Sequence, residues 1–501
     1  MEKQKTQRVV NGLYEITEKT RENLLDNAYY NEDLAPTKLA DRTWTTYNVA
    51  ALWVGMSVCI PTYMMASGVM SAGLSWWQAI LNIIIANFIV LIPMQLNSHA
   101  GTKYGIPFPV FARLSFGIKG AHIASMARAL VAAGWFGINT WIGGTALDGV
   151  MSAISDGWAN WSGGVWVAFG VFWLINVGIA YKGLHAIKIL ESLAAPILFV
   201  ISVGLMAWAY LGVRATGGTL LDILSLPATY GEGEFLTVWM GGLAANIAFW
   251  ATLALNIPDF SRYAKTQKDQ FMGQLLGLPT TMGAFAFVGV FVTGASRIIF
   301  GEMIWDPVVI VASMDSVIAS LLGAFGIALA SLSTNIAANV VAPANGISNL
   351  NPKKITYKMG IIITGLFGIV IMPWKLLATA GAYIFGWLGT YGLFLGPLAG
   401  MFVADYYIYR KKMLDLDDLF RGEKSRYWYG NGFNYKAIWT WIIAGFFPLL
   451  GKVVPSLSML ASAGWMIGFV IALIIYPILM KNETESIITD EMDKQITEVV
   501  E

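Results

Sequence analysis

Long apolar runs recur along the chain between residues 46 and 480, and short polar or charged stretches separate them. Each run approaches the ~20 residues that an α-helix needs to cross the ~30 Å hydrocarbon core of a bilayer. The pattern predicts an all-α polytopic membrane protein with two polar tails. The twelve predicted transmembrane helices are 46–70, 77–97, 123–149, 164–182, 189–212, 236–257, 275–299, 309–341, 356–373, 377–404, 436–454 and 458–480.

Two of these spans contain helix breakers near the middle of the membrane. Gly55 and Pro61 flank Ser57 in the first span, and the sixth reads GGLAANIAFWATLALNIPDF. An offset of five spans is typical of a five-plus-five inverted repeat with helices 1 and 6 broken at the substrate site. The alternative is that Gly and Pro are simply frequent in membrane helices. The predicted parts are a tail at 1–45, repeats at 46–212 and 236–404, a loop at 405–435, helices 11 and 12 at 436–480, and a tail at 481–501.

Lysine and arginine are unevenly divided between the two predicted sides of the membrane. Nineteen of those between residues 46 and 480 fall on the side that holds both tails, whereas only Arg214, Arg297, Lys375 and Lys452 fall on the other side. Because cytoplasmic loops are enriched in Lys and Arg, we expect a multi-pass protein of the cell (plasma) membrane with both termini in the cytoplasm.

The composition narrows the possible partners. Hydrophobic residues make up 56% of the chain and charged residues 13%, about half the charged share of a soluble domain. The net charge of +1 argues against nucleic acid, which requires a basic face. A single cysteine, Cys59, excludes a disulfide within the chain, and the three histidines are far apart in sequence. We therefore expect the lipid bilayer as a partner, a monomer, and no cofactor.

A first polar cluster lies in the third span, which contains the motif WFGINTW. Trp135 and Asn139 are four residues apart and so share one face of a helix. An indole beside a carboxamide suits a flat heterocycle, because the ring can stack on the indole and the amide offers an acceptor and donors to an N–H/C=O edge. The alternative is that Trp135 or Trp141 belongs to an aromatic belt at the membrane interface.

Two further clusters contain polar groups at mid-depth. Trp250 lies within the sixth span, just before its break, where it is either a ligand contact or ordinary packing. The stretch SLSTNIAAN contains Ser333 and Thr334, whose oxygens suit a Na⁺ ion together with carbonyls of an unwound helix. Asn335 and Asn339 follow, and we expect Asn335 to brace the broken helices. The alternative is hydrogen bonding between helices, which is common in membrane bundles.

The motifs that are absent from the sequence indicate which energy source drives the protein. The chain contains no P-loop for ATP, no G-x-S-x-G elbow and no H-E-x-x-H pair, so we expect a transporter driven by an ion gradient and not an enzyme. Asp259 and Arg262, three residues apart, form either a gate pair or a simple ion pair at the boundary. A central carboxylate or histidine, usual in proton relays, is not visible, which favours Na⁺ over H⁺.

The chain resembles the nucleobase:cation symporter-1 family from about Leu34 to Met480. Within that family it looks most like the bacterial allantoin, hydantoin and uracil permeases. The motifs that carry the resemblance are AALWVGM, HAGTKYGIPFPVFARLSFGIKG, WFGINTW, ALNIPDFSRYAKTQKDQ, STNIAANVVAP and GPLAGMFVADYYIYRKK.

The resemblance implies the inverted repeat and assigns two sets of residues. The substrate ring would lie between Trp135 and Trp250, its polar edges would meet Asn139 and Asn339, and Ile384 would gate the site. A sodium ion would be held by Gly55, Val58, Ala330, Ser333 and Thr334.

Two residues depart from the family pattern. The amide of the third span is Gln in the hydantoin pattern and Asn139 here, and the residue after the carbonyl ligands is an amide there and Cys59 here. Both positions lie where substrate is expected, so the resemblance does not decide which ureide or nucleobase is carried. The intact Ser333/Thr334 pair is compatible with Na⁺ and leaves H⁺ open.

These patterns favour a secondary active transporter that imports a flat ureide or nucleobase by cation symport. The first alternative is a transporter of the same fold for another small solute, such as a vitamin or an amino acid. An amino acid would need its two charges neutralised, and the central clusters contain no charged side chain. The second alternative is a channel, which would show a conductance far above the turnover of a carrier, or a membrane-embedded enzyme, for which no nucleophile or metal set is visible.

Overall fold

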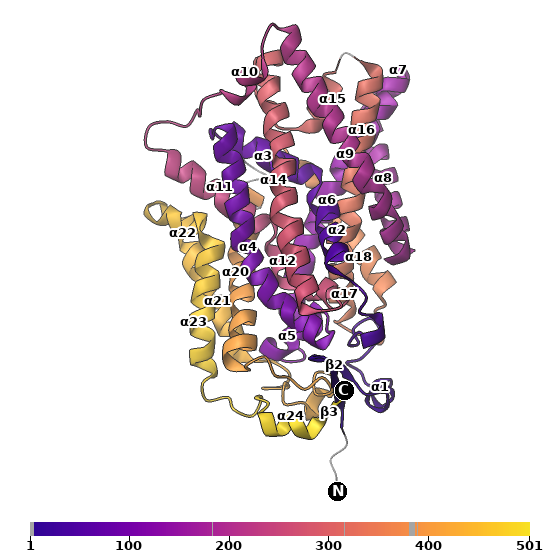
Figure 1. Ribbon diagram of the computed structural model, residues 1–501, viewed down its shortest axis with the longest axis vertical. Coiled ribbons are helices and arrows are strands. Elements are labelled where there is room, and N and C mark those ends of the chain that lie inside the picture. The colour runs from indigo at the N-terminus through magenta and orange to yellow at the C-terminus, as the bar shows by residue number, and fades with distance from the viewer. Residues whose placement is uncertain (1–4, 183, 315, 380–385, 388, 501) are drawn as a thin grey trace.

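The computed structural model describes residues 5–182, 184–314, 316–379, 386–387 and 389–500. Long helices run roughly along the longest axis of the molecule, and both ends of the chain lie at the same end of the bundle (Figure 1). We call this the tail end, and we call the opposite end, where α10 (Leu220–Leu224) and α15 (Pro307–Ala312) lie, the far end.

The remaining elements follow in chain order. Three short strands are β1 (Gln7–Val10), β2 (Leu13–Ile16) and β3 (Thr497–Val499). The other α-helices are α1 (Glu18–Leu24), α2 (Thr46–Ser57), α3 (Ile60–Ser71), α4 (Trp76–Tyr104), α5 (Phe108–Phe116), α6 (Ala121–Ile154), α7 (Asp156–Ala159), α8 (Gly164–Tyr181), α9 (Leu184–Ala215), α11 (Phe235–Phe249), α12 (Ala251–Asn256), α13 (Pro258–Ser261), α14 (Gln267–Phe300), α16 (Val317–Asn339), α17 (Val341–Ser348), α18 (Tyr357–Val370), α19 (Pro373–Leu376), α20 (Gly389–Val403), α21 (Tyr435–Val453), α22 (Ser458–Ser462), α23 (Gly464–Met480) and α24 (Asp490–Ile496). Shorter 3₁₀ or π turns are η1 (Leu39–Asp41), η3 (Ala404–Tyr409), η4 (Gly422–Lys424) and η5 (Pro455–Leu457).

Within the described residues, seven helices are long and apolar enough to cross a bilayer, and two bent pairs raise the number to nine. The bent pairs are α2 with α3 and the η5–α22 segment with α23. The predicted spans at 236–257 and 356–373 correspond to shorter helices, and the span at 377–404 falls partly outside the described residues. A helical membrane bundle is therefore clear, while the number twelve stays a prediction.

The first predicted span is broken where its sequence contains proline. Helix α2 ends at Ser57, and α3 begins at Ile60 with Pro61 in its first turn, where a missing N–H costs nothing. Between them Cys59 is extended, with φ −142° and ψ 157°, and the two helices make an angle of 58°. The chain therefore exposes backbone polar groups between Ser57 and Ile60, inside an otherwise apolar span.

The predicted span at 309–341 is wrong as a single helix. Asp306 accepts a hydrogen bond from the backbone N–H of Val308 and caps α15, whereas Ser316 caps a separate helix, α16. At its other end α16 stops at Asn339, and α17 continues the chain to Ser348 after a distortion at Val340. Side-chain caps at Asp306 and Ser316 thus divide a continuous apolar pattern into separate helices.

Helices α20 and α23 pack closely through glycines of the GPLAG motif. A Cβ placed on Gly396 would lie 2.2 Å from the carbonyl oxygen of Trp465, and one on Gly400 would lie 2.1 Å from that of Phe469. Backbones this close exclude any larger residue at either position. The predicted role of this motif in helix packing is confirmed.

The two tails meet in a small sheet with strand order β2-β1-β3. Strands β1 and β2 form an antiparallel hairpin around Asn11 and Gly12, both with positive φ as a tight hairpin turn requires. Strand β3, from the other end of the chain, pairs in parallel with β1. The tails, which the sequence predicts only as polar segments, are therefore joined and ordered.

Arg42 anchors the first tail to the bundle. Its guanidinium is buried and donates to the backbone carbonyls of Thr37, Thr102 and Tyr14. The guanidinium carries five N–H donors and can bond several carbonyls at once. This side chain therefore joins the tail to the end of α4 and to β2.

Candidate functional site

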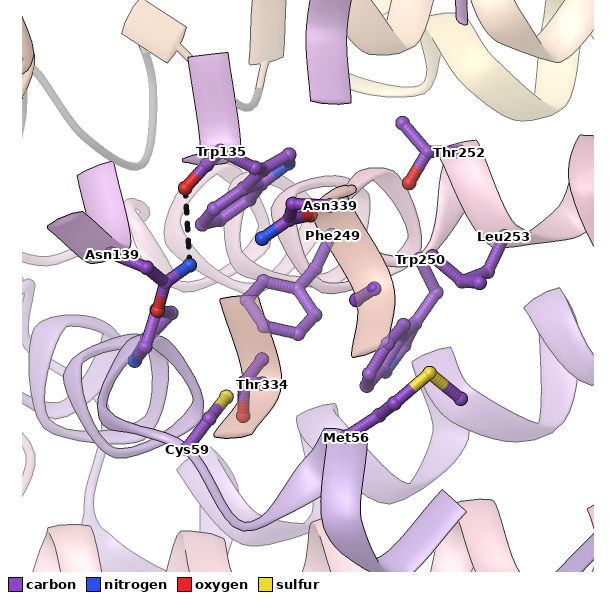
Figure 2. Close-up of a pocket in the computed structure, with 12 residues that line it drawn as sticks. Met56, Cys59, Trp135, Asn139, Phe249, Trp250, Thr252, Leu253, Thr334 and Asn339 are labelled. Atoms are coloured by element: carbon purple, nitrogen blue, oxygen red, sulfur yellow. Dashed lines mark hydrogen bonds between the residues drawn. The ribbon is translucent and has the colours of Figure 1, made fainter. Parts of the chain in front are cut away.

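The breaks in the helices surround a small central pocket. Its volume is about 20 Å³, and its walls come from α2, α3, α6, α11, α12, α16 and the residues next to the breaks (Figure 2). The residues that line the central pocket are Met56, Cys59, Pro61, Trp135, Asn139, Phe249, Trp250, Thr252, Leu253, Thr334, Ala338 and Asn339. The structure therefore brings together five of the predicted substrate contacts: Cys59, Trp135, Asn139, Trp250 and Asn339. Ile384, the predicted gate, lies outside the described residues.

The space between the two predicted tryptophans is filled by a third ring. The centroid of Phe249 lies 5.1 Å from that of Trp135 and 4.9 Å from that of Trp250, edge-on to both. Figure 2 shows the Phe249 ring between the two indoles. A volume of 20 Å³ is about what one water molecule needs, so a heterocycle requires Phe249 to move aside.

Trp135 is held in place from a different helix. Its indole Nε1 donates to the hydroxyl of Tyr391 on α20 at 3.2 Å, and that hydroxyl donates in turn to the backbone carbonyl of Ala248 at 2.8 Å. The indole is 5% exposed. The ring is therefore fixed by α20 and α11, which makes it a wall of the pocket and not part of an interfacial belt.

The amide of Asn139 has a fixed orientation. Its Nδ2 donates to the backbone carbonyl of Trp135 at 3.1 Å, and a carbonyl can only accept. Its Oδ1 is buried and has no hydrogen-bond partner among the described residues. Because a buried acceptor without a partner costs about 1–3 kcal/mol, this oxygen would be stabilised by a donor from outside the chain.

Asn335 fixes the orientation of the second amide. Its Nδ2 lies 3.1 Å from the backbone carbonyl of Phe136, the hydroxyl of Thr140 and Oδ1 of Asn176. The Phe136 carbonyl requires a donor, so Oδ1 of Asn335 must face the other way, where it accepts from Nδ2 of Asn339 at 3.1 Å. Asn339 is thereby left with its own Oδ1 to offer to a ligand.

This network corrects one expectation. We expected Asn335 to brace the broken helices, but it joins α16 to α6 and α8, neither of which is broken at the contact. The physical reason is that α8 supplies a buried amide, Asn176, at the depth of Asn335. No spacing within the SLSTNIAAN stretch could reveal this partner.

The predicted cation ligands lie beside the central pocket. In a continuous helix Gly55 O would accept from the N–H of Cys59, but that N–H donates to Ser57 O. The N–H of Thr62 likewise donates to Cys59 O in place of Val58 O. The break thus releases the carbonyls of Gly55 and Val58 from helical bonding, which is the kind of oxygen that a Na⁺ site uses.

Helix α16 supplies the other predicted cation ligands. The hydroxyl of Thr334 donates to Gly55 O at 3.4 Å, which brings α16 and α2 into contact. Ser333 and Ala330 are buried on α16, and Ala330 shares a cavity wall with Val58. Within the described residues no three His, Cys, Asp or Glu side chains gather around a possible metal, so hydroxyl and carbonyl oxygens are the donors that fit a monovalent cation here.

The predicted pair of Asp259 and Arg262 is not formed. Asp259 accepts from the backbone N–H of Phe108 at 2.9 Å, whereas Arg262 donates to the carbonyl of Asp33 in the first tail and to the hydroxyl of Tyr263. Arg262 is therefore bonded to the first tail, whose position the sequence does not predict. The two side chains therefore secure α5 and the tail separately.

Phe249 is the main residue that the sequence reasoning missed. Met56, Thr252, Leu253 and Ala338 also line the pocket. A signal for Phe249 was present, because it immediately precedes Trp250 at the predicted break, where helical spacing no longer decides which side chains share a face.

Comparison with known proteins places this geometry in a family. The permeases for cytosine/purines, uracil, thiamine and allantoin match residues 36–468 of this chain. A purine-uracil permease of Arabidopsis thaliana is 42% identical over 480 residues, covering 92% of this chain and 79% of the relative. An allantoin permease of Bacillus subtilis (strain 168) is 40% identical over 466 residues, covering 91% and 94%. The chain belongs to the nucleobase:cation symporter-1 family.

A solved structure supports the same conclusion for the fold. Mhp1, a nucleobase-cation-symport-1 family transporter in a closed conformation with bromovinylhydantoin bound, matches with a TM-score of 0.78 at 25% identity, covering 94% of this chain and 99% of Mhp1. The predicted family and the predicted fold class, a polytopic helical transporter, are confirmed. The protein is an integral membrane transporter.

Proposed function

We propose that this transporter imports a flat ureide or nucleobase of the allantoin, hydantoin or uracil type by cation symport, alternating between outward-open and inward-open states. The observation that carries the proposal is the orientation of two amides, Asn139 and Asn339. In both, Nδ2 donates to an acceptor within the protein, which fixes the amide and leaves its Oδ1 to accept from a ligand. Two acceptors between aromatic rings select a planar ligand with at least two N–H groups.

The relatives agree with this chemistry. Their names include allantoin, uracil and hydantoin permeases, and these solutes share a planar ring that carries N–H groups beside carbonyls. An amino acid fits the pocket less well, because among the described lining residues none is charged. The ring would take the space between Trp135 and Trp250 once the Phe249 side chain rotates away.

The coupling ion is proposed to be Na⁺, with H⁺ as the alternative. The supporting observation is the pair of carbonyls, of Gly55 and Val58, that the helix break releases, together with the hydroxyl of Thr334, which contacts Gly55 O and follows Ser333 on α16. A cation there would join α2 to α16. Cation and substrate would then favour each other's binding, since such coupling is reciprocal.

Uptake into proteoliposomes tests the substrate and the ion together. Radiolabelled allantoin, hydantoin and uracil are supplied with a Na⁺ gradient, with a pH gradient, or with neither. We expect uptake of at least one solute, and weaker competition by its N-methylated analogues, since each methyl group removes a donor to Asn139 or Asn339. If N-methylated and parent compounds compete equally, the two amide oxygens do not select the ligand.

A pair of threonine variants tests the ion site. Thr334→Val removes the hydroxyl that contacts Gly55 O, and Thr364→Val removes an equally buried hydroxyl that only bonds Gly360 O within α18. We expect only Thr334→Val to raise the Na⁺ concentration needed for half-maximal uptake. If both variants respond alike, or if a pH gradient alone drives uptake, the proposed Na⁺ site is wrong.

The orientation and assembly of the protein are also proposed. Following the distribution of Lys and Arg, we place both tails in the cytoplasm of the cell, and we separately propose that the chain is a monomer. Cys59 is fully buried, so a cysteine introduced at Thr484 or at Ser458 can be labelled selectively in intact cells. We expect an impermeant maleimide to label the Ser458→Cys variant and to spare Thr484→Cys.

A further inference from the structure

A second and larger cavity lies on the opposite face of α16 from Asn335. Its volume is about 320 Å³, and helices α3, α9, α14, α15 and α16 surround it. On α16 its lining residues recur at intervals of three and four from Ala319 to Ala330, which is one stripe of a helix. We call it the lateral cavity, and none of the proposed substrate contacts lines it.

The walls of the lateral cavity are apolar. Its lining residues are Val58, Ile60, Tyr63, Leu198, Val200, Ile201, Ser202, Gly204, Leu205, Trp208, Phe285, Val288, Pro307, Val311, Met314, Ala319, Leu322, Gly323, Gly326, Ile327 and Ala330. None of them is charged, and the hydroxyl of Ser202 donates within its own helix to Leu198 O at 2.8 Å. A dry apolar cavity of about 150 Å³ is enough to bind benzene, so this one has room for a longer hydrocarbon.

The cavity reaches the outside of the bundle between α9 and α16. Val200 and Leu322 line it and are also 68% and 59% exposed. Gly204 follows Val200 by four residues on α9 and also lines the cavity, and a Cβ added to it would meet nothing within 4 Å. Both helices belong to apolar segments that are long enough to span a bilayer. The medium at the mouth is therefore hydrocarbon.

We propose that the lateral cavity is a lipid site that takes one acyl chain of a phospholipid from the leaflet at the far end. An apolar opening toward hydrocarbon admits a chain that the surrounding bilayer supplies, whereas a charged headgroup would find no charged partner among the lining residues. Burying a hydrocarbon chain contributes about 0.8 kcal/mol per CH₂ when the chain comes from water and much less when it leaves lipid. The acyl chain is therefore held mainly because its shape fits the cavity and because it fills space that would otherwise be empty.

The inner end of the lateral cavity lies next to the proposed cation ligands. Val58 and Ala330 line the lateral cavity and lie beside Gly55 and Thr334, where the two broken-helix carbonyls are released. An acyl chain in this position closes the apolar side of that polar region against water. The assignment of the lipid site rests on the cavity and its mouth, and it holds whatever solute the central pocket carries.

Photo-cross-linking in vesicles tests the proposal without any transport measurement. The full-length protein is reconstituted in phosphatidylcholine vesicles with a trace of phosphatidylcholine that carries a diazirine at the end of one acyl chain. Illumination and peptide mapping then locate the label. We expect label on Leu198, Leu205 and Ile327, at a higher yield than on Leu174, an exposed residue of α8 that does not line the lateral cavity.

Two matched tryptophan variants decide between a cavity site and ordinary lipid contact. Gly204→Trp places a bulky ring at the mouth, whereas Gly178→Trp makes the same change on exposed α8, where a Cβ also meets nothing within 4 Å. We expect Gly204→Trp to lose the labels inside the cavity and Gly178→Trp to retain them, with both variants unfolding at the wild-type temperature. Leu322→Trp, on the opposite rim, repeats the test if Gly204→Trp does not fold.

Three results would overturn the assignment. The first is a yield inside the cavity no higher than at Leu174, and the second is label that persists in both rim variants. The third is label that unlabelled fatty acid displaces and unlabelled phosphatidylcholine does not, since this would identify a free fatty acid as the occupant.

Discussion

Replacing Asn335 with alanine should weaken substrate binding although Asn335 does not line the pocket. Three acceptors lie 3.1 Å from its Nδ2 and share the two N–H groups, its Oδ1 accepts from Asn339, and the side chain is fully buried. Its removal frees the amide of Asn339 to rotate. A rotated amide presents its NH₂ group where the proposed ligand also has an N–H, so donor would face donor.

The cost to stability follows from the groups that are left behind. Phe136 O and the hydroxyl of Thr140 still bond each other at 2.6 Å. Oδ1 of Asn176 and Nδ2 of Asn339 each lose a partner within the protein. At about 1–3 kcal/mol for each buried orphan, Asn335→Ala should destabilise the protein by about 2–6 kcal/mol.

The cost to binding is smaller, because only the orientation of one amide is lost. A neutral hydrogen bond contributes about 0.5–1.5 kcal/mol net, which corresponds to a roughly 2- to 13-fold weaker affinity. Competition binding with radiolabelled allantoin or uracil measures this change, and thermal unfolding in detergent measures stability. Asn87→Ala is the matched control, because this buried asparagine on α4 donates only to Ile83 O within its own helix.

A double-mutant cycle gives the result that would refute this reasoning. If Asn335 acts on the substrate through Asn339, then Asn335→Ala should change affinity little in a chain that already carries Asn339→Ala, since contacting residues couple. Additive losses would show that Asn335 influences the ligand by another route. An unchanged affinity in the single Asn335→Ala variant would show that the amide of Asn339 is oriented without it.

Three further predictions concern separate features. Phe249→Ala should admit heterocycles with bulkier substituents and destabilise the protein by about 3–5 kcal/mol, measured by competition binding and thermal unfolding against Phe169→Ala, an equally buried phenylalanine away from the pocket. Arg42→Ala should release the first tail and expose it to trypsin, whereas Arg8→Ala, which removes a half-exposed ion pair, should not. Burial, and secondly the nearby negative charge of Asp418, raise the pKa of Asp415 to about 7 in the folded loop. Because the folded state then binds more protons than the unfolded state, the free energy of unfolding should fall as pH rises from about 4 toward 7. Asp415→Asn should remove that pH dependence in thermal unfolding scans.

The parts that sequence reasoning predicted correctly depend on local chemistry. Pro61 cannot continue a helix from its N-terminal side, and the chain does break between Ser57 and Ile60. Trp135 and Asn139 are four residues apart on one uninterrupted helix, so their common face is a matter of geometry. Both features need only a few residues of context.

The parts that it missed depend on partners from distant segments. The orientation of Asn339 is decided through Asn335 by Asn176 on α8, which is 159 residues from Asn335 along the chain. The parallel pairing of β3 with β1 joins the two ends of the chain, and no local pattern specifies it. The hairpin at Asn11 and Gly12 is different, because an Asn-Gly pair between apolar residues is the strongest short-range hairpin signal and was overlooked within a tail predicted only as polar.

Helix α16 connects the two proposed ligands, and its geometry explains how one could influence the other. The hydroxyl of Thr334 contacts Gly55 O and also lines the central pocket, while Asn339 lies little more than one helical turn further along. The preceding turns of the same helix form a wall of the lateral cavity, where Ile327 and Ala330 lie seven and four residues before Thr334. A shift of α16 relative to α2 therefore changes the cation ligands and the substrate's acceptor together. Because Asn335 ties α16 to α6 and α8 at this level, such a shift would require these three helices to move as a unit, and a cation that joins α16 to α2 would oppose the movement.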